Sequence, residues 1–117
     1  MIMLFYISKI ISFDFDNTLT QLSSLFPKQK VINALRHCCN IGYEIIIVSA
    51  RRPEEKQVIK SFCEKHRIPV CRSYFTSNKL KGRLLRKLGV EVHFDDDDIQ
   101  IESARLYGVK VVDAKKF

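Results

Sequence analysis

No uninterrupted apolar stretch of this 117-residue chain is long enough to cross a membrane, so we expect no membrane partner. The chain also has no internal repeat, no low-complexity segment and no linker, and its length predicts a single domain over residues 1–117. Residues 1–11 are apolar but have neither a basic start nor a cleavage pattern. We therefore expect them to run into a strand and not to form a signal peptide.

Cysteine is present, but its spacing does not match a redox or zinc motif. The four cysteines include no Cys-x-x-Cys pair, and three of them fall at apolar helix or strand positions. This pattern favours reduced thiols over disulfides, which indicates a reducing compartment and a cytoplasmic protein. His37 precedes two of the cysteines, but one helix at this spacing does not provide four zinc ligands.

Two acidic clusters each follow an apolar segment. Asp14 and Asp16 come directly after residues 10–13, and four consecutive aspartates at 95–98 come directly after residues 90–94. Parallel sheets hold their ligands beyond the carboxyl ends of their strands, so the two clusters predict one Mg²⁺ site. One carboxylate could attack a phosphoryl group while another transfers protons. The alternative for a lone Asp-x-Asp is a solvated turn, and two clusters in the same context favour the site.

Two further polar residues follow the same logic. Ser49 ends the β-branched run at 44–48, and its hydroxyl could hydrogen-bond a phosphoryl oxygen. It could equally cap the helix that Pro53 predicts to begin nearby, and both alternatives remain open. Lys81 begins a stretch whose leucines follow helical spacing. Its ammonium could pair with the nucleophilic carboxylate and with a bound phosphate.

Strand and helix patterns alternate along the chain. We expect strands near 7–15, 44–48, 68–72, 90–94 and 109–112, and helices near 28–40, 53–66, 81–88 and 99–107. This alternation predicts an α/β fold, a Rossmann-like three-layer α/β/α sandwich with a mainly parallel five-stranded sheet. The site is expected at the edge where the first, second and fourth strands end.

Four motifs of the chain resemble, in order, those of the haloacid dehalogenase-like (HAD) phosphohydrolase superfamily. They are residues 13–20 (FDFDNTLT), residues 48–51 (VSAR), Lys81 and residues 93–97 (HFDDD). The similarity covers nearly the whole chain, and the first motif is specific. It implies a HAD-like fold and a Mg²⁺-dependent phosphatase that acts through an aspartyl-phosphate intermediate.

The resemblance also implies a role for individual residues. Asp14 would be the nucleophile, and Asp16 would be the general acid to the leaving group and then the base to the hydrolytic water. The implied Mg²⁺ ligands are the Asp14 carboxylate, the Asp16 backbone carbonyl and a carboxylate of either Asp95 or Asp96. The implied site thus contains catalytic residues Asp14, Asp16, Ser49 and Lys81 and substrate-binding residues Asn17, Thr18, Ala50 and Arg51.

Two assignments stay open within this resemblance. Many family members place a further Asp four residues after the fourth motif, and this chain has none there, so either Asp95 or Asp96 could contact the metal. Lys79 is a rival for the lysine of the third motif. Lys81 is favoured because it opens the leucine-patterned helix.

The spacing of the motifs leaves no room for a cap domain. Asp14 and Ser49 are 35 positions apart and Ser49 and Lys81 are 32 apart, and a helix plus a strand uses most of each interval. Residues 21–27 could form only a small flap. An open site of this kind could admit a phosphate carried by a large molecule, or a neighbouring subunit of an oligomer could close it.

Acidic residues are scarce outside the two clusters. Six of the 13 acids belong to the clusters, which leaves 7 against 20 lysines and arginines. A cationic surface speeds the capture of anionic substrates and could grip a nucleic-acid backbone, although it could also serve solubility alone. We therefore expect a phosphohydrolase for nucleic-acid 3′-phosphate ends or nucleotides. The alternative is a non-catalytic HAD-fold protein whose basic face holds nucleic acid or a protein partner.

Overall fold

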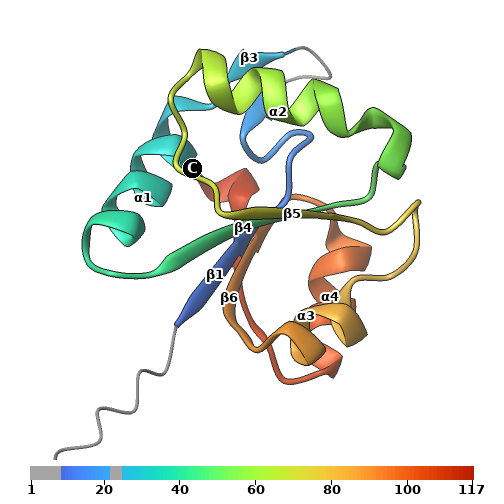
Figure 1. The fold of residues 1–117 in the computed structure, drawn as a ribbon. Coiled ribbons are helices and arrows are strands. Elements are labelled where there is room, and N and C mark those ends of the chain that lie inside the picture. The colour runs from blue at the N-terminus through green and yellow to red at the C-terminus, as the bar shows by residue number, and fades with distance from the viewer. Residues whose placement is uncertain (1–8, 22–24) are drawn as a thin grey trace, which may run out of the picture.

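A five-stranded parallel sheet forms the middle layer of the protein (Figure 1). The computed structural model describes residues 9–21 and 25–117. The strands of the sheet are β1 (Ile10–Phe13), β4 (Glu44–Ser49), β5 (Arg72–Phe75), β6 (Val90–Asp95) and β7 (Lys110–Asp113). Their order is β5-β4-β1-β6-β7. The expected strand over residues 7–15 is shorter in the structure, and its first two residues lie outside the described ranges.

Helices cover both faces of the sheet. They are α1 (Gln29–Asn40), α2 (Lys56–Lys65), α3 (Gly82–Leu88) and α4 (Asp98–Leu106). Successive strand residues point to opposite faces. Ile11 and Phe13 of β1 therefore pack in the cluster that contains α1 and α2, whereas Ile10 packs in the cluster that contains α3 and α4. The predicted three-layer α/β/α class is thus confirmed.

The chain reverses its direction of travel across the sheet beside β1. It first adds β4 and β5 on one side, and then crosses through α3 to add β6 and β7 on the other. Both neighbours of β1 are parallel to it, so the loops after β1, β4 and β6 leave the sheet at the same edge. Ligands bind at such a switch point in open α/β sheets.

One expected element lies elsewhere in the sequence. The strand expected over 68–72 is β5, Arg72–Phe75, which pairs with residues 46–49 of β4. Ile68 is buried in the α1/α2 cluster, and Pro69 has no backbone N–H to give to a sheet ladder. The apolar signal of this segment therefore reflects core packing before the strand begins.

The structure also tests the expected second helix, the flap, the cysteines and the absence of a membrane span. The helix expected over 53–66 begins as a 3₁₀ turn, Pro53–Glu55, before α2. Between β1 and α1, the described residues form the two-stranded antiparallel sheet of β2 (Thr20–Gln21) and β3 (Phe26–Pro27), which agrees with a small flap. All four cysteines are free thiols, and Cys71 is exposed. Among the described helices, none combines the length and apolar character needed to span a bilayer.

Candidate active site

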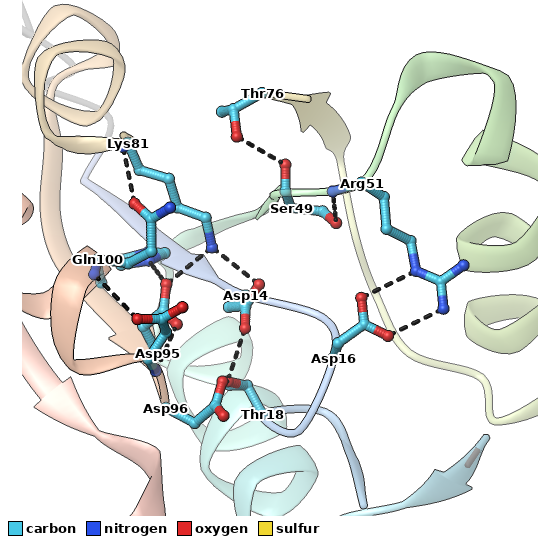
Figure 2. A network of polar contacts seen from close by, with 12 residues as sticks. Asp14, Asp16, Thr18, Ser49, Arg51, Thr76, Lys81, Asp95, Asp96 and Gln100 are labelled. Carbon is cyan, nitrogen blue, oxygen red and sulfur yellow. Dashed lines mark hydrogen bonds and ion pairs between the residues drawn. The ribbon is translucent and has the colours of Figure 1, made fainter. Parts of the chain in front are cut away.

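Asp14 lies where β1 leaves the sheet. Its backbone N–H donates to the Phe94 carbonyl at 2.8 Å, which fixes it beside the end of β6. The residue is 6% exposed. One carboxylate oxygen lies 2.8 Å from Lys81 Nζ and the other lies 3.2 Å from the Thr18 hydroxyl (Figure 2). A buried carboxylate is therefore held between a cation and a hydroxyl at the expected edge of the sheet.

The turn after β1 returns Thr18 to Asp14. The backbone N–H groups of Thr18, Leu19 and Thr20 all point to the Phe15 carbonyl, at 3.3, 3.0 and 3.2 Å. Asn17 has a φ of 60°, a left-handed conformation that Asn tolerates better than most residues. Its backbone N–H donates to Thr20 Oγ1 at 3.1 Å. This tight turn closes the first motif around the Asp14 carboxylate.

Asp95 is the most enclosed acid of the site. Its side chain is fully buried, and its Oδ2 lies 2.8 Å from both Lys81 Nζ and His93 Nε2. Its Oδ1 accepts the Asp97 backbone N–H at 3.1 Å. The far ring nitrogen of His93, Nδ1, lies 2.6 Å from the Ser12 hydroxyl. A buried chain of polar contacts thus runs from Ser12 through His93 and Asp95 to Lys81.

The proton positions in this chain follow from the chemistry of its members. The ionised Asp95 carboxylate can only accept, so His93 Nε2 carries the proton and donates it. Burial lowers the pKa of His93, although the hydrogen bond to Asp95 opposes that shift. The neutral ring therefore accepts from the Ser12 hydroxyl at Nδ1.

The electrostatics separate the three acids. Burial raises the pKa of Asp14 well above its ordinary value, and Lys81 offsets this only in part. Burial would also raise the pKa of Asp95, but hydrogen bonding from His93 and the charge of Lys81 outweigh it and the pKa falls. Burial raises the pKa of the half-buried Asp96. Lys81 is desolvated as well, yet its two carboxylate partners raise its pKa and keep it charged.

Asp14, Asp95 and Asp96 form a candidate metal site. Each offers one carboxylate oxygen, and these oxygens lie within 4.8 Å of one another. Three carboxylates against the single ammonium of Lys81 leave a formal charge of −2, which suits a divalent cation. An all-oxygen donor set suits a hard cation such as Mg²⁺. The residues therefore fit the expected metal.

Asp16 lies apart from this trio. Arg51 holds its carboxylate with two hydrogen bonds, Nε to Oδ2 and Nη2 to Oδ1, both at 2.9 Å. The remaining Arg51 nitrogen, Nη1, donates to Glu55 at 3.0 Å, and the guanidinium lies over the Phe15 ring. The Asp16 side chain is 42% exposed, so it faces solvent while paired. Figure 2 shows it on the opposite side of the loop from Asp96.

Ser49 and Ala50 lie at the end of β4. The Ser49 hydroxyl oxygen accepts the Arg51 backbone N–H at 3.0 Å, which shapes the turn toward the 3₁₀ segment. The Ala50 carbonyl accepts the Asn78 backbone N–H at 2.8 Å. Ala50 lines a small cavity of about 200 Å³ together with Asp16 and Arg51. Ser49 itself is fully buried and lines neither of the small cavities of the site.

The structure brings Asp14, Thr18, Lys81, Asp95 and Asp96 together. Four of the other five expected residues line two small cavities: Asn17 lines one of about 230 Å³ with Asp96, and Asp16, Ala50 and Arg51 line the cavity of about 200 Å³. The fifth, Ser49, is buried at the end of β4.

The two candidate lysines lie in different places. Lys81 reaches Asp14, whereas Lys79 is exposed and accepts hydrogen bonds from Thr76 and Gln100 at its carbonyl. The Lys81 backbone N–H donates to the buried Gln100 side chain at 2.9 Å. Sequence reasoning did not assign a role to Gln100, Ser12 or His93. His93 could have been found, because it lies two residues before Asp95 on β6 and so shares its face.

Comparisons with known proteins support the fold. No protein-family model and no curated protein matches the chain. Chains of two solved structures, a Pnkp1/Rnl/Hen1 RNA repair complex and a Pnkp1/Rnl/Hen1 complex, resemble it with TM-scores of 0.77 and 0.78. The identities are 17% and 16%, over 91% and 93% of this chain. The chain spans 42% and 46% of those matched chains, less than half of their length.

Proposed function

We propose that this chain is a Mg²⁺-dependent phosphohydrolase of the HAD-like type, formed as one domain, that acts through an aspartyl phosphate on Asp14. The observation that carries the proposal is the buried Asp14 carboxylate, placed 2.8 Å from Lys81 and within the acidic trio. A solvated turn would not bury its acids or pair them with a buried ammonium. This arrangement is what covalent phosphoryl transfer to a carboxylate requires.

The proposed reaction uses the groups already described. An Asp14 oxygen forms a bond to phosphorus as the bond to the leaving oxygen breaks, and that oxygen takes a proton from Asp16. Water then attacks the phosphorus of the aspartyl phosphate and gives its proton to Asp16, which releases phosphate and restores Asp14. Lys81 and Thr18 hold the Asp14 carboxylate in place. A bound Mg²⁺ would supply neutralising charge to the transferring group.

We infer that the substrate is a phosphorylated nucleic-acid end or a nucleotide. Two observations support this class: the matched chains come from RNA repair complexes, and cations outnumber acids 20 to 13. The short β2–β3 flap is consistent with an open site for a large substrate. Because the matched chains belong to multi-protein complexes, the proposal also includes protein partners for this chain.

The second candidate function is binding without catalysis. It is favoured by one observation, the engagement of Asp16 by Arg51 away from the trio. A binding protein would nevertheless have no use for two carboxylates in the first motif, so we place catalysis first.

Release of inorganic phosphate separates the two candidates. Candidate substrates are 3′-phosphorylated oligonucleotides, mononucleotides, sugar phosphates and phosphopeptides, each with Mg²⁺ and with excess chelator. Asp14→Asn should abolish turnover, because an amide is too poor a nucleophile to form the acyl phosphate. Asp98→Asn, the same chemical change at an exposed acid that pairs with Lys115, should retain it. Phosphate release by Asp14→Asn at the wild-type rate would rule out the mechanism.

A further inference from the structure

A cavity of about 610 Å³ lies between the loop that follows β5 and one side of α3. These two segments are drawn in yellow and orange in Figure 1. Its lining includes three apolar side chains, Phe75, Leu80 and Leu84, and three cationic ones, Lys79, Arg83 and Lys87. None of the lining residues is acidic. Leu80 is 60% exposed, which places an apolar surface in contact with solvent at this position. The cavity thus combines an apolar wall with positive charge.

The three cations of the cavity have no internal partner. In residues 9–21 and 25–117, none of them forms an ion pair, which is also true of most other lysines and arginines there. Arg83 and Lys87 are also four residues apart on α3, where like charges repel each other. The charge of these three side chains is therefore not offset by an acidic partner within the described residues.

The loop that lines the cavity is hydrogen-bonded to the end of β4, next to the candidate active site. The wall of the cavity includes Thr76, whose backbone N–H donates to the Ser49 carbonyl at 2.9 Å. Two residues further along, the Asn78 backbone N–H donates to Ala50 at 2.8 Å. The same loop then leads to Lys81 and its contact with Asp14. The segment that lines the cavity therefore also positions the lysine that contacts Asp14.

We propose that this cavity binds a nucleotide of a single-stranded nucleic acid, with the base against the apolar wall and the backbone phosphates on the three cations. The volume lies within the range of small-ligand pockets. Bases bind proteins by stacking on aromatic side chains, and the apolar wall offers one, Phe75, beside Leu80 and Leu84. An acidic peptide would satisfy the cations but would leave the apolar wall without a flat partner. The further statement that this strand presents its terminal phosphate to Asp14 rests on the proposed function.

Direct binding tests the cavity without requiring turnover. The probe is a fluorescent single-stranded RNA of about eight nucleotides with a 3′-hydroxyl, measured by anisotropy over a range of salt concentrations. Arg83→Gln with Lys87→Gln should weaken binding roughly tenfold, and should reduce the slope of log affinity against log salt by about 1.4, since each single-strand contact contributes roughly 0.7. The matched control is Arg105→Gln with Lys110→Gln, which removes two exposed charges outside the cavity and should bind as the wild type does.

Two further probes distinguish nucleotide binding from attraction by charge alone. An abasic strand of equal length should bind more weakly than the RNA, because it has no base to cover Leu80 and Leu84. A polyglutamate peptide should not compete at equal charge. Equal binding of the abasic strand, competition by the peptide or equal losses in both double variants would overturn the proposal.

Phosphate release from a small chromogenic ester by the wild type is measured in parallel. Ester hydrolysis without cavity-dependent RNA binding would refute the cavity and leave the proposed function standing. Cavity-dependent RNA binding without any phosphate release would refute the proposed function and leave the cavity standing.

Discussion

Replacing Lys81 tests whether one buried cation holds the acidic site together. Lys81→Met removes the ammonium and keeps most of the side-chain volume, so Asp14 and Asp95 lose a partner at 2.8 Å each. Removing one partner of a buried ion pair destabilises a protein by about 3–5 kcal/mol. Protonation of Asp14, whose pKa is already raised, removes its unpaired charge and so reduces this loss of stability. The value of about 3–5 kcal/mol is therefore an upper bound. At roughly 4 °C per kcal/mol, the expected fall in Tm is about 12–20 °C.

The measurement is urea unfolding at neutral pH in the presence of chelator. Lys79→Met is the matched control, because it makes the same substitution two residues away on an exposed side chain and should change stability by less than about 0.5 kcal/mol. At one Mg²⁺ concentration, Mg²⁺ should stabilise Lys81→Met more than the wild type, because the variant should bind it more tightly; a protein gains about 2.7 kcal/mol when Mg²⁺ is at a hundredfold excess over its own Kd. The reason for the tighter binding is that loss of the ammonium makes the net formal charge of the variant site one unit more negative.

The pH dependence of this difference has a defined sign. The pKa of Asp95 is lowered in the folded protein, so its stabilising contribution is present above the unfolded pKa of about 3.9 and is lost as the pH falls. Lys81→Met removes much of that contribution. The difference between the wild type and the variant should therefore be full at neutral pH and shrink as the pH falls below about 4. Equal stability of Lys81→Met and Lys79→Met at neutral pH would refute this account of the site.

Substitutions at two further residues, His93 and Arg51, test the surroundings of the trio. His93→Leu should raise the apparent Kd for Mg²⁺, measured by thermal titration, by about 10–100-fold. His93→Gln should recover part of the affinity, because its amide can still donate to Asp95. An unchanged Kd in His93→Leu would contradict this role. Arg51→Ala should change stability by less than about 1 kcal/mol because its partner Asp16 is 42% exposed. It should weaken inhibition by inorganic phosphate, and an unchanged inhibition constant would count against a phosphate contact.

The sheet and its acidic edge could be predicted because both depend on local pattern. Apolar segments that alternate with helical ones specify parallel strands, and residues that directly follow such strands must meet at one edge. Asp14 and Asp95 were found in this way from positions 81 residues apart. The predicted position of β5 was wrong. The strand, Arg72–Phe75, is the outermost strand of the sheet, and its residues are at most partly buried. An edge strand carries a weaker apolar signal than the core residue Ile68 that precedes it.

The contacts of individual side chains could not be predicted from pattern. Arg51 and Asp16 belong to different motifs, and their pairing depends on the rotamers of two long-range neighbours. Gln100 reaches Lys81 from α4 because α3 and α4 pack closely there: a Cβ on Gly82 would lie 2.2 Å from the Ser103 carbonyl oxygen. Only glycine fits at that contact. Such contacts are fixed by the packed structure and not by the spacing of residue types.

The candidate active site is negatively charged, whereas the cavity beside α3 is positively charged. The trio and Lys81 carry a formal charge of −2 and would repel a phosphate dianion, whereas Lys79, Arg83 and Lys87 form a cationic rim on the cavity beside α3. Attraction at long range therefore comes from the rim, and approach to Asp14 depends on a divalent cation that neutralises the formal charge of −2. Since the acidic centre opposes a substrate until that cation binds, favourable contacts remote from the phosphate are needed. On the proposed function, this requirement favours a substrate that extends from Asp14 into the cavity over a small free metabolite.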